Sequence, residues 1–487
     1  DDSLADYQLF GVQLTRLTKE AVKDESLTSK EVDRCKNFFA LGLMCWLYER
    51  PIEVVEDEIT QRFAKKPKYL NANMSVLKAG YNYGDNSAQF RIRYQVPSMP
   101  ASEPGIYRNV SGNEALMLGL VAASQKSGHE LFLGSYPITP ASDILHYLAA
   151  RKEFGVRTFQ AEDEIAAVCA AIGASYGNHL AVTSTSGPGL ALKAEAIGLA
   201  VMVELPLVII NVQRGGPSTG LPTKTEQADL MQVMYGRNGE CPVPVIAARS
   251  PSDCFQVAYE ACRIAIKYMM PVMLLSDGSI ANGAEPWRVP DVGDLEDIPS
   301  TEISAVPAGG EFQPYARDPE TLARPWPRVG TSGLEHRLGG IEKWDVTGHI
   351  SYDPENHDHM VKTRQARVDG ITRELAPSKL VGDSEGDVLV VSWGSTYGAC
   401  LTAVRQLQNM GKKVSLLPLR WINPMPTDVG EHLQRFKTVL VPEINSGQLI
   451  KLLRQRYQFN GKGYNRVAGQ PLAVAAVKEA IVDCLSS

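Results

Sequence analysis

Residues 180–223 read LAVTSTSGPGLALKAEAIGLAVMVELPLVIINVQRGGPSTGLPT. Two apolar runs rich in β-branched residues, 180–185 and 206–212, lie on either side of an Ala- and Leu-rich helical pattern over 190–202. Apolar strands that alternate with helices are typical of a mostly parallel sheet covered by helices on both faces. This stretch therefore predicts an α/β fold.

The same alternation continues on both sides of this stretch. Before it, the sequence predicts helices over 113–127 and 161–176 and a strand at 130–134; after it, a helix over 254–268 and a strand at 271–275. A second alternation begins at residue 387, with strands at 387–393, 413–419 and 438–442 and helices at 397–409, 428–436 and 446–457. Residues 285–328 and 333–359 show no clear period, so we expect irregular connections there.

The first hundred residues show helical spacing of apolar side chains without alternating strands. Residues 31–50 place apolar side chains at helical spacing, and further helices are predicted over 52–64 and 69–79. Three prolines within 95–105 indicate a linker. A chain of 487 residues has room for about two to four domains. We predict three domains, over 1–106, 107–375 and 376–487.

Composition and charge exclude several classes of protein. Hydrophobic residues make up 44% and charged residues 21%, which excludes a disordered chain and a coiled-coil rod. A net charge of -6 gives no global attraction to nucleic acid or to anionic membranes. The N-terminus is acidic and no apolar run reaches the length of about 20 residues that spans a bilayer, so we expect a cytoplasmic protein. The chain begins without Met, which indicates that an earlier segment is missing.

The eight cysteines are scattered, and no two form a CxxC pair. Structural metal sites and iron–sulfur clusters usually group cysteines at short spacing. We therefore expect no metal site within this chain. Scattered single cysteines in a long chain are typical of a reducing compartment.

Three loops follow predicted strands and differ from ordinary connections. They are SYPITPAS at 135–142, SGPG at 186–189 and QRGGPSTGLPT at 213–223. Ligands of open parallel sheets bind beyond the carboxyl ends of the strands, and all three loops should lie at that edge. The sequence therefore places a candidate site there.

Two side chains in these loops could bind an anion. Thr139 precedes Pro140, which restrains its backbone, and its hydroxyl could donate to a carboxylate or phosphate. The alternative is that this hydroxyl only caps the next helix. Arg214 could hold a carboxylate with two hydrogen bonds beside a glycine-rich loop. The alternative for Arg214 is a surface side chain beside a flexible turn.

Glu164 lies near the start of a helix that is rich in small residues, with sequence EIAAVCAAIGASY. An acid in a first turn is favoured by the helix dipole, and this also explains the neighbouring Glu162 and Asp163. The small side chains after Glu164 indicate close packing against another surface. We therefore expect the Glu164 carboxylate to be nearly buried, in surroundings that favour its neutral form.

Taken together, these motifs resemble a known family. The order of Glu164, TSTSGPG at 183–189, GNEA at 112–115, YPITP at 136–140 and VQRGGPSTGLPT at 212–223 resembles the alpha subunit of 2-oxoacid:ferredoxin oxidoreductases. The resemblance implies a pyrimidine-binding domain of the thiamine-diphosphate-enzyme type. Residues 387–445 resemble the family's transketolase C-terminal-like α/β domain. Residues 1–80 resemble the C-terminal part of its gamma domain.

The resemblance implies a chemistry and a role for each candidate residue. The reaction would convert a 2-oxoacid, coenzyme A and oxidised ferredoxin into acyl-CoA, CO2 and reduced ferredoxin, and could run backwards as CO2 fixation. Glu164 would bind N1′ of the thiamine diphosphate aminopyrimidine and favour the tautomer that deprotonates the thiazolium. Pro137 and Thr139 would line the cofactor. Thr139 and Arg214 would hold the substrate carboxylate.

The resemblance also implies a partner. The chain has no GDG motif, which in thiamine enzymes holds the diphosphate through Mg2+. A beta subunit would then carry Mg2+ and a [4Fe–4S] cluster, and the isolated chain would be inactive. An (alpha–beta)2 heterotetramer would act on the 2-oxoacid and coenzyme A and pass electrons to ferredoxin.

QRGGPSTGLPT, the fused gamma domain, GLEH at 333–336 and SYDPENH at 351–357 together most resemble family members that act on 2-oxoglutarate or on a broad range of 2-oxoacids, and we favour 2-oxoglutarate. Candidates for its second carboxylate are Lys224, His336, His349 and His357, although each could be a solvated loop residue. Pyruvate, a branched-chain or indolepyruvate-type acid, or broad specificity stays open. A transketolase-like transferase and a non-catalytic scaffold subunit stay open as well. A nicotinamide-binding enzyme is disfavoured because no GxGxxG follows the predicted strands.

Overall fold

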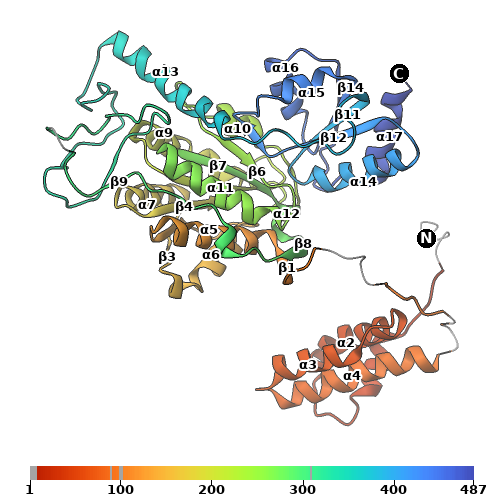
Figure 1. The fold of residues 1–487 in the computed structure, drawn as a ribbon. Helices are drawn as coiled ribbons and strands as arrows, with labels where there is room; N and C mark the ends of the chain where they lie inside the picture. The colour runs from red at the N-terminus through yellow and green to blue at the C-terminus, as the bar shows by residue number, and fades with distance from the viewer. Residues whose placement is uncertain (1–7, 88–89, 91, 98–102, 308–309, 487) are drawn as a thin grey trace. The chain divides into compact units, whose positions relative to one another are not determined.

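A computed structural model describes residues 8–87, 90, 92–97, 103–307 and 310–486 (Figure 1). The chain divides into two compact units, residues 1–104 and residues 105–487, and each is described by itself. Part of the predicted linker, residues 98–102, lies outside the described residues. The division between the units lies close to the predicted boundary at 106, while the three-domain assignment stays a prediction.

The first unit is helical. Its helices are α1 (Leu14–Ala21), α2 (Ser29–Leu47), α3 (Ile52–Phe63) and α4 (Pro67–Asn86). A capping box starts α2, in which Glu31 N donates to Thr28 Oγ1 at 3.4 Å and Thr28 N donates to Glu31 Oε2 at 2.7 Å. Helices α2 and α4 approach closely through glycines, since a Cβ on Gly42 would lie only 2.0 Å from the Leu77 carbonyl oxygen. The α4 helix is longer than the predicted 69–79.

The second unit is built on a seven-stranded sheet in the order β13-β6-β7-β5-β4-β2-β3. Its strands are β2 (Leu131–Ser135), β3 (Arg157–Gln160), β4 (Leu180–Thr185), β5 (Leu207–Gln213), β6 (Val245–Ala247), β7 (Pro271–Asp277) and β13 (Trp421–Asn423). All neighbours pair in parallel except β13, which pairs antiparallel with β6. The predicted mostly parallel α/β sheet is therefore confirmed.

Helices cover the two faces of this sheet (Figure 1). In one group α5 (Gly112–Ser127) contacts both α6 (Ser142–Ala149) and α11 (Asp253–Tyr268). The other is α7 (Glu164–Tyr176), α8 (Gly187–Leu192) and α9 (Ala194–Val203). The single helix predicted over 190–202 is thus two helices that meet at Lys193.

A second, four-stranded parallel sheet has the order β12-β11-β14-β15. It contains β11 (Gly386–Trp393), β12 (Val414–Leu419), β14 (Phe436–Glu443) and β15 (Gly461–Asn465), with helices α14 (Thr396–Asn409), α15 (Val429–Gln434), α16 (Gln448–Arg456) and α17 (Val474–Leu485). Polar bonds join it to the larger sheet: Asp277 of β7 accepts from Ser395 N at 3.2 Å, and Gln227 Nε2 donates to the Trp393 main-chain oxygen at 2.8 Å.

The prediction of irregular structure over 333–359 is wrong at its end, because α13 (Pro354–Gly370) begins there. The helix has no apolar stripe to reveal it. Its buried positions are mainly polar and include Asn356, Arg364 and Arg367. Buried ion pairs of Arg364 and Arg367, together with the buried apolar side chains Met360 and Val368, hold this helix on the protein.

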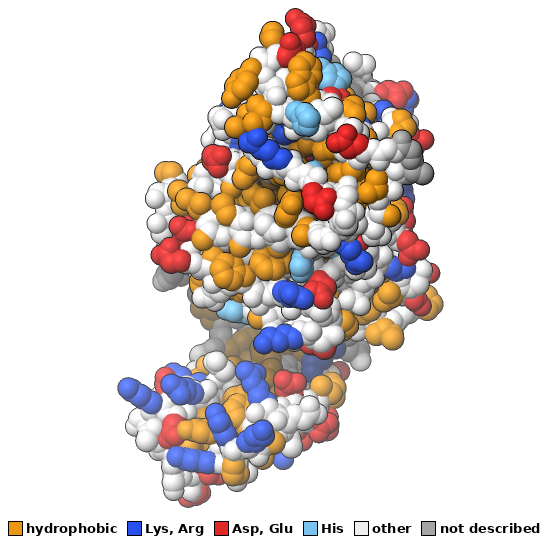
Figure 2. All heavy atoms as spheres, turned by 90° about the vertical axis from the view of Figure 1, so that its left-hand side faces the viewer, with side chains coloured by type: hydrophobic (Ala, Val, Ile, Leu, Met, Phe, Trp, Pro, Cys, Tyr) orange, Lys and Arg blue, Asp and Glu red, His pale blue; other side chains and the backbone are white. Residues whose placement is uncertain are grey.

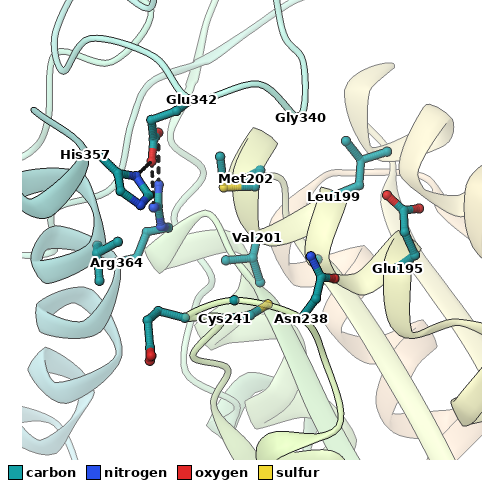
Figure 3. A pocket seen from close by; sticks show the side chains of 14 residues that line it. Glu195, Leu199, Val201, Met202, Asn238, Cys241, Gly340, Glu342, His357 and Arg364 are labelled. Atoms are coloured by element: carbon teal, nitrogen blue, oxygen red, sulfur yellow. Dashed lines mark hydrogen bonds and ion pairs between the residues drawn. The ribbon is translucent and has the colours of Figure 1, made fainter. Parts of the chain in front are cut away.

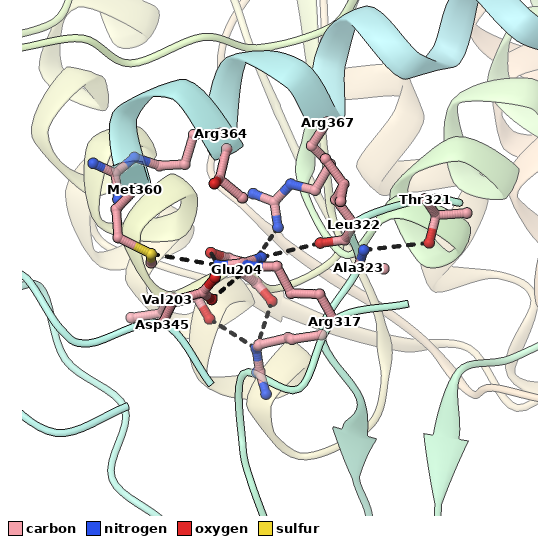
Figure 4. Close-up of polar contacts among 12 residues, drawn as sticks. Val203, Glu204, Arg317, Thr321, Leu322, Ala323, Asp345, Met360, Arg364 and Arg367 are labelled. Atoms are coloured by element: carbon pink, nitrogen blue, oxygen red, sulfur yellow. Dashed lines mark hydrogen bonds and ion pairs between the residues drawn. The ribbon is translucent and has the colours of Figure 1, made fainter. Parts of the chain in front are cut away.

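Glu204 is the centre of these ion pairs (Figure 4). It follows α9 and is fully buried. Arg317 donates to both of its carboxylate oxygens at 2.9 Å, and Arg367 donates to Oε2. Arg317 also donates to Asp345 at 2.8 Å. This arrangement, here called the Glu204 cluster, fastens the connecting segment and α13 to α9.

Candidate active site

The three predicted loops emerge side by side. Strands β2, β4 and β5 are neighbours, with Gly134 opposite Thr183 and Thr185 opposite Asn211. The loops that follow them therefore leave the sheet at one edge and at one level. This is the position at which parallel sheets bind ligands.

Arg214 and Thr139 meet at this edge. Arg214 Nη1 donates to the main-chain oxygen of Thr139 at 2.6 Å, while Arg214 Nε is buried without a partner among the described residues. Only 8% of Arg214 is exposed, so it is not a surface side chain. Thr139 and Pro137, in the loop that follows β2, are exposed. No side chain caps α6, so the Thr139 hydroxyl is not its cap.

Glu164 lies beside the SGPG loop. Asp163 is the N-cap of α7 and accepts from Ala166 N at 2.8 Å, which makes Glu164 the first helical residue. A Cβ on Gly189 would lie 2.0 Å from Tyr136 Oη and 2.7 Å from Glu164 Cγ. Only glycine leaves room for these two side chains, so the loops bring Glu164 and Tyr136 together.

The predicted burial of Glu164 is wrong within this chain. Its side chain is half-buried, Ala166 and Cys169 are exposed, and Ile165 is 46% exposed. Close packing exists on the inner side of α7 only, where a Cβ on Gly134 would lie 2.3 Å from the Ala167 oxygen. The outer side of the helix faces away from this chain's own core.

Several buried polar atoms at the same edge have no partner among the described residues. They include Ser186 Oγ, Asn211 Oδ1 and Arg214 Nε. Buried polar groups are normally hydrogen-bonded, so such a group of unpaired atoms fits a polar ligand. The edge therefore offers a hydroxyl, an amide oxygen and a guanidinium N–H to such a ligand.

Three residues of this region were not singled out from the sequence. Tyr136 bonds Thr185 Oγ1 at 2.8 Å, and burial raises the pKa of Tyr136 well above its usual value, with Glu164 adding to the effect. Asp229 accepts from Asn211 Nδ2 at 2.9 Å, and burial raises the pKa of Asp229. Lys193 is fully buried. Lys193 could have been noticed in the sequence, because it is a single lysine within an apolar helical pattern.

The four candidates for a second carboxylate lie apart. Lys224 is exposed at the end of the loop that carries Arg214, and His349 is exposed on the connecting segment. His336 bonds the Leu334 oxygen at 2.8 Å. His357 bonds Glu342 at 2.8 Å in a cavity of about 510 Å3, whose described lining includes neither Thr139 nor Arg214 (Figure 3). Of the four, only Lys224 adjoins a predicted site loop, because it directly follows residues 213–223.

The described residues contain no group of three or more His, Cys, Asp or Glu side chains arranged to hold a metal ion. All eight cysteines are free. None of the helices in the described ranges combines the length and the apolar character needed to cross a membrane.

Family models match three segments. The one described as "Pyruvate flavodoxin/ferredoxin oxidoreductase, thiamine diP-bdg" matches residues 125–352. "Pyruvate ferredoxin/flavodoxin oxidoreductase" matches 2–83, and "Pyruvate:ferredoxin oxidoreductase core domain II" matches 386–473. The loops of the candidate site lie within the first of these segments.

The chain is 54% identical to 2-oxoglutarate oxidoreductase subunit KorA of Mycobacterium tuberculosis, over 96% of this chain and 71% of that protein. The chain belongs to the 2-oxoacid:ferredoxin oxidoreductase family. Another member is the alpha subunit of 2-oxoacid:ferredoxin oxidoreductase 1 of Aeropyrum pernix, 30% identical over 98% of this chain and 75% of that one. The predicted resemblance to the family's alpha subunits is confirmed.

A solved structure of the family has a similar fold. It is the 2-oxoglutarate:ferredoxin oxidoreductase of Magnetococcus marinus with 2-oxoglutarate, coenzyme A and succinyl-CoA bound. The match has a TM-score of 0.86 at 30% identity and covers 96% of this chain and 80% of that chain. The family's members are oxidoreductase subunits, so this chain is a subunit of an oxidoreductase.

Proposed function

We propose that the chain is the alpha subunit of a 2-oxoglutarate:ferredoxin oxidoreductase that forms succinyl-CoA. In the reaction, 2-oxoglutarate loses CO2, its acyl group is transferred to coenzyme A, and the electrons released pass to ferredoxin. The observation that carries the proposal is the meeting of Glu164, Thr139 and Arg214 at one sheet edge, in a chain 54% identical to a 2-oxoglutarate oxidoreductase subunit.

Glu164 is assigned the catalytic role at the cofactor. Thiamine diphosphate, when bound, supplies the carbon nucleophile that a 2-oxoacid requires. The Glu164 carboxyl group would hold a proton at N1′ of the aminopyrimidine, since it lies on the open side of the SGPG loop beside Tyr136. Pro137 and Thr139, exposed at the mouth of the neighbouring loop, would line the same space.

Arg214 is assigned to the substrate carboxylate. Its guanidinium is almost buried, and the bond to the Thr139 oxygen fixes its direction. An unpaired Nε remains for an incoming acceptor. A charge-assisted hydrogen bond from a buried arginine orients a carboxylate strongly, and Thr139 could add its hydroxyl.

The exposed side of α7 supports a partner subunit. Ile165 and Tyr176 are 46% and 40% exposed, and Leu192 at the end of α8 is 54% exposed. Figure 2 looks onto the side on which α7 and α9 lie in Figure 1, and it shows hydrophobic side chains spread across this side of the larger unit. We infer that a beta subunit covers Glu164 here and brings Mg2+ and a [4Fe–4S] cluster, in an (alpha–beta)2 complex.

The three segments matched by family models support the domain assignment. We infer a partial gamma domain over 1–106, a pyrimidine-binding domain with its long connection over 107–375 and a transketolase C-terminal-like domain over 376–487. The free cysteines support a reducing, cytoplasmic location.

Steady-state kinetics of the complex with its beta subunit test the substrate. The complex should reduce ferredoxin or a viologen only when a 2-oxoacid and coenzyme A are present, and kcat/KM should be higher for 2-oxoglutarate than for pyruvate. A ratio that favours pyruvate would reject the substrate choice. Ketol transfer between sugars without viologen reduction would reject the oxidoreductase in favour of a transketolase-like transferase.

A further inference from the structure

Lys193 is the residue at which α8 ends and α9 begins, and none of it is exposed. Its ammonium donates to the main-chain oxygen of Glu164 at 2.9 Å and to Thr183 Oγ1 at 3.0 Å. Its Nζ also lies 5.4 Å from the centre of the Tyr136 ring. One buried cation thus joins the first turn of α7, strand β4 and the loop after β2.

This arrangement is costly for a packing residue. Both hydrogen-bond acceptors are neutral oxygens, and a buried ammonium without a paired carboxylate loses most of its hydration. Burial lowers the pKa of Lys193 to about 8, although the nearby charge of Glu164 opposes this shift. An apolar side chain of similar length would fill the same space at a lower free-energy cost.

The position of Lys193 excludes a direct chemical role. Its side chain is completely covered, so the amine cannot reach a substrate carbonyl. Its contact is with the backbone of Glu164, while the Glu164 side chain extends toward Gly189 and the open edge. Any effect of Lys193 on the reaction must therefore act through the residues that it contacts, and Glu164 is the one among them that is assigned to the cofactor.

We propose that Lys193 is a positioning residue that fixes the first turn of α7 against β4 and thereby sets where the Glu164 carboxyl group meets the cofactor. This inference rests on the proposed function of Glu164. A displacement of about 1 Å at a reacting group can cost on the order of 10²-fold in rate, which is the scale of effect that such an anchor prevents.

Lys343 provides a matched control. It is another buried lysine, and its Nζ donates to the Met202 oxygen at 3.0 Å and lies 5.5 Å from the centre of the Tyr315 ring. Burial lowers the pKa of Lys343 to about 8, as it does for Lys193. Lys343 lies near the Glu204 cluster rather than near Glu164. Substitution by Met removes the same groups at both positions.

A double-mutant cycle in the complex with the beta subunit tests the proposal. Lys193→Met should lower kcat by about 10²-fold and raise the dissociation constant of thiamine diphosphate by about tenfold, because Glu164 is no longer held in place. In a Glu164→Gln background the same substitution should add less than about twofold to either loss, since positioning has no effect once its target is removed. Lys343→Met should lower thermal stability while leaving both quantities within about twofold.

The possible results separate the two proposals. The positioning role would be overturned if the loss from Lys193→Met were as large in the Glu164→Gln background as in the wild type. It would also be overturned if Lys343→Met produced the same losses. Either result would leave the role of Glu164 intact. A Glu164→Gln complex with unchanged kcat and cofactor affinity would overturn both. If Lys193→Met does not assemble, Lys193→Gln, which keeps a donor without the charge, is measured in the same cycle and judged by the same results.

Discussion

Glu204 and Glu164 are two glutamates of the same unit with opposite surroundings. Glu204 is fully buried, and Arg317 and Arg367 occupy its oxygens. Burial acts to raise the pKa of Glu204, but the charges of Arg367 and Arg317 outweigh it and lower the pKa to about 2. Glu164 is half-buried beside polar atoms that have no partner among the described residues.

The difference shows how this chain uses charge. Around Glu204 the chain supplies every partner itself, and the charge serves to fasten a connecting segment. Around Glu164 the partners are incomplete, which fits a cofactor, a substrate and a second subunit that complete them. Substitutions in the two regions should therefore separate stability from activity.

The largest expected effect is on stability, from Glu204→Gln. The substitution leaves Arg317 and Arg367 without their shared carboxylate in a buried place, which should cost about 3–5 kcal/mol in the free energy of unfolding. Urea denaturation followed by tryptophan fluorescence measures this cost. A loss of unfolding free energy below about 1 kcal/mol, which is typical of a surface ion pair, would contradict the structural role of Glu204.

Low pH should remove the stabilisation that the Glu204 carboxylate provides, by an amount similar to the effect of Glu204→Gln. Because the pKa of Glu204 is about 2 in the folded state and near 4.5 in an ordinary setting, its contribution is complete above pH 4.5 and is lost as the pH falls toward 2. The contribution is about 3 kcal/mol. Denaturation curves at pH 5 and pH 3 should show a smaller difference between the wild type and Glu204→Gln at the lower pH. An unchanged difference would contradict the assigned role of the two arginines.

Glu164→Gln should lower activity and leave stability nearly unchanged. Loss of the carboxyl group that holds a proton at the cofactor should lower kcat of the complex by about 10²-fold. The free energy of unfolding should change by less than about 0.5 kcal/mol, because the side chain is half-buried on an open surface. An unchanged kcat would indicate a non-catalytic scaffold subunit instead.

Arg214→Lys should have a smaller effect on substrate binding. Lysine keeps the charge but cannot both hold the Thr139 oxygen and present a second donor in the same plane. We expect KM for the 2-oxoacid to rise by about tenfold, with a smaller change in kcat. Lys224→Ala, on the same loop but exposed, serves as the control and should leave KM for pyruvate unchanged. Equal effects of the two substitutions would remove the specific role of Arg214.

The sequence predicted the sheet and the neighbouring positions of its loops. Apolar runs such as 206–212 are almost continuous, as expected of strands buried on both faces, and parallel topology brings their carboxyl ends together. The loops carrying Thr139 and Arg214 were therefore recognisable, and the structure adds the 2.6 Å bond that joins them.

Features that depend on partners from distant segments could not be predicted. Helix α13 buries Arg364 and Arg367 because Glu342 and Glu204 lie opposite them, and no pattern within the helix reveals this. The half-exposed state of Glu164 was missed for a related reason. Small residues indicate a close contact, but they do not reveal which chain provides it.

The central claim is that this chain provides half of a thiamine diphosphate site. Calorimetric titration of thiamine diphosphate with Mg2+, together with viologen reduction by 2-oxoglutarate and coenzyme A, tests it on the isolated chain and on the complex with the beta subunit. We predict saturable cofactor binding and turnover in the complex, with weak binding and no turnover in the isolated chain. Full turnover by the isolated chain would contradict the account.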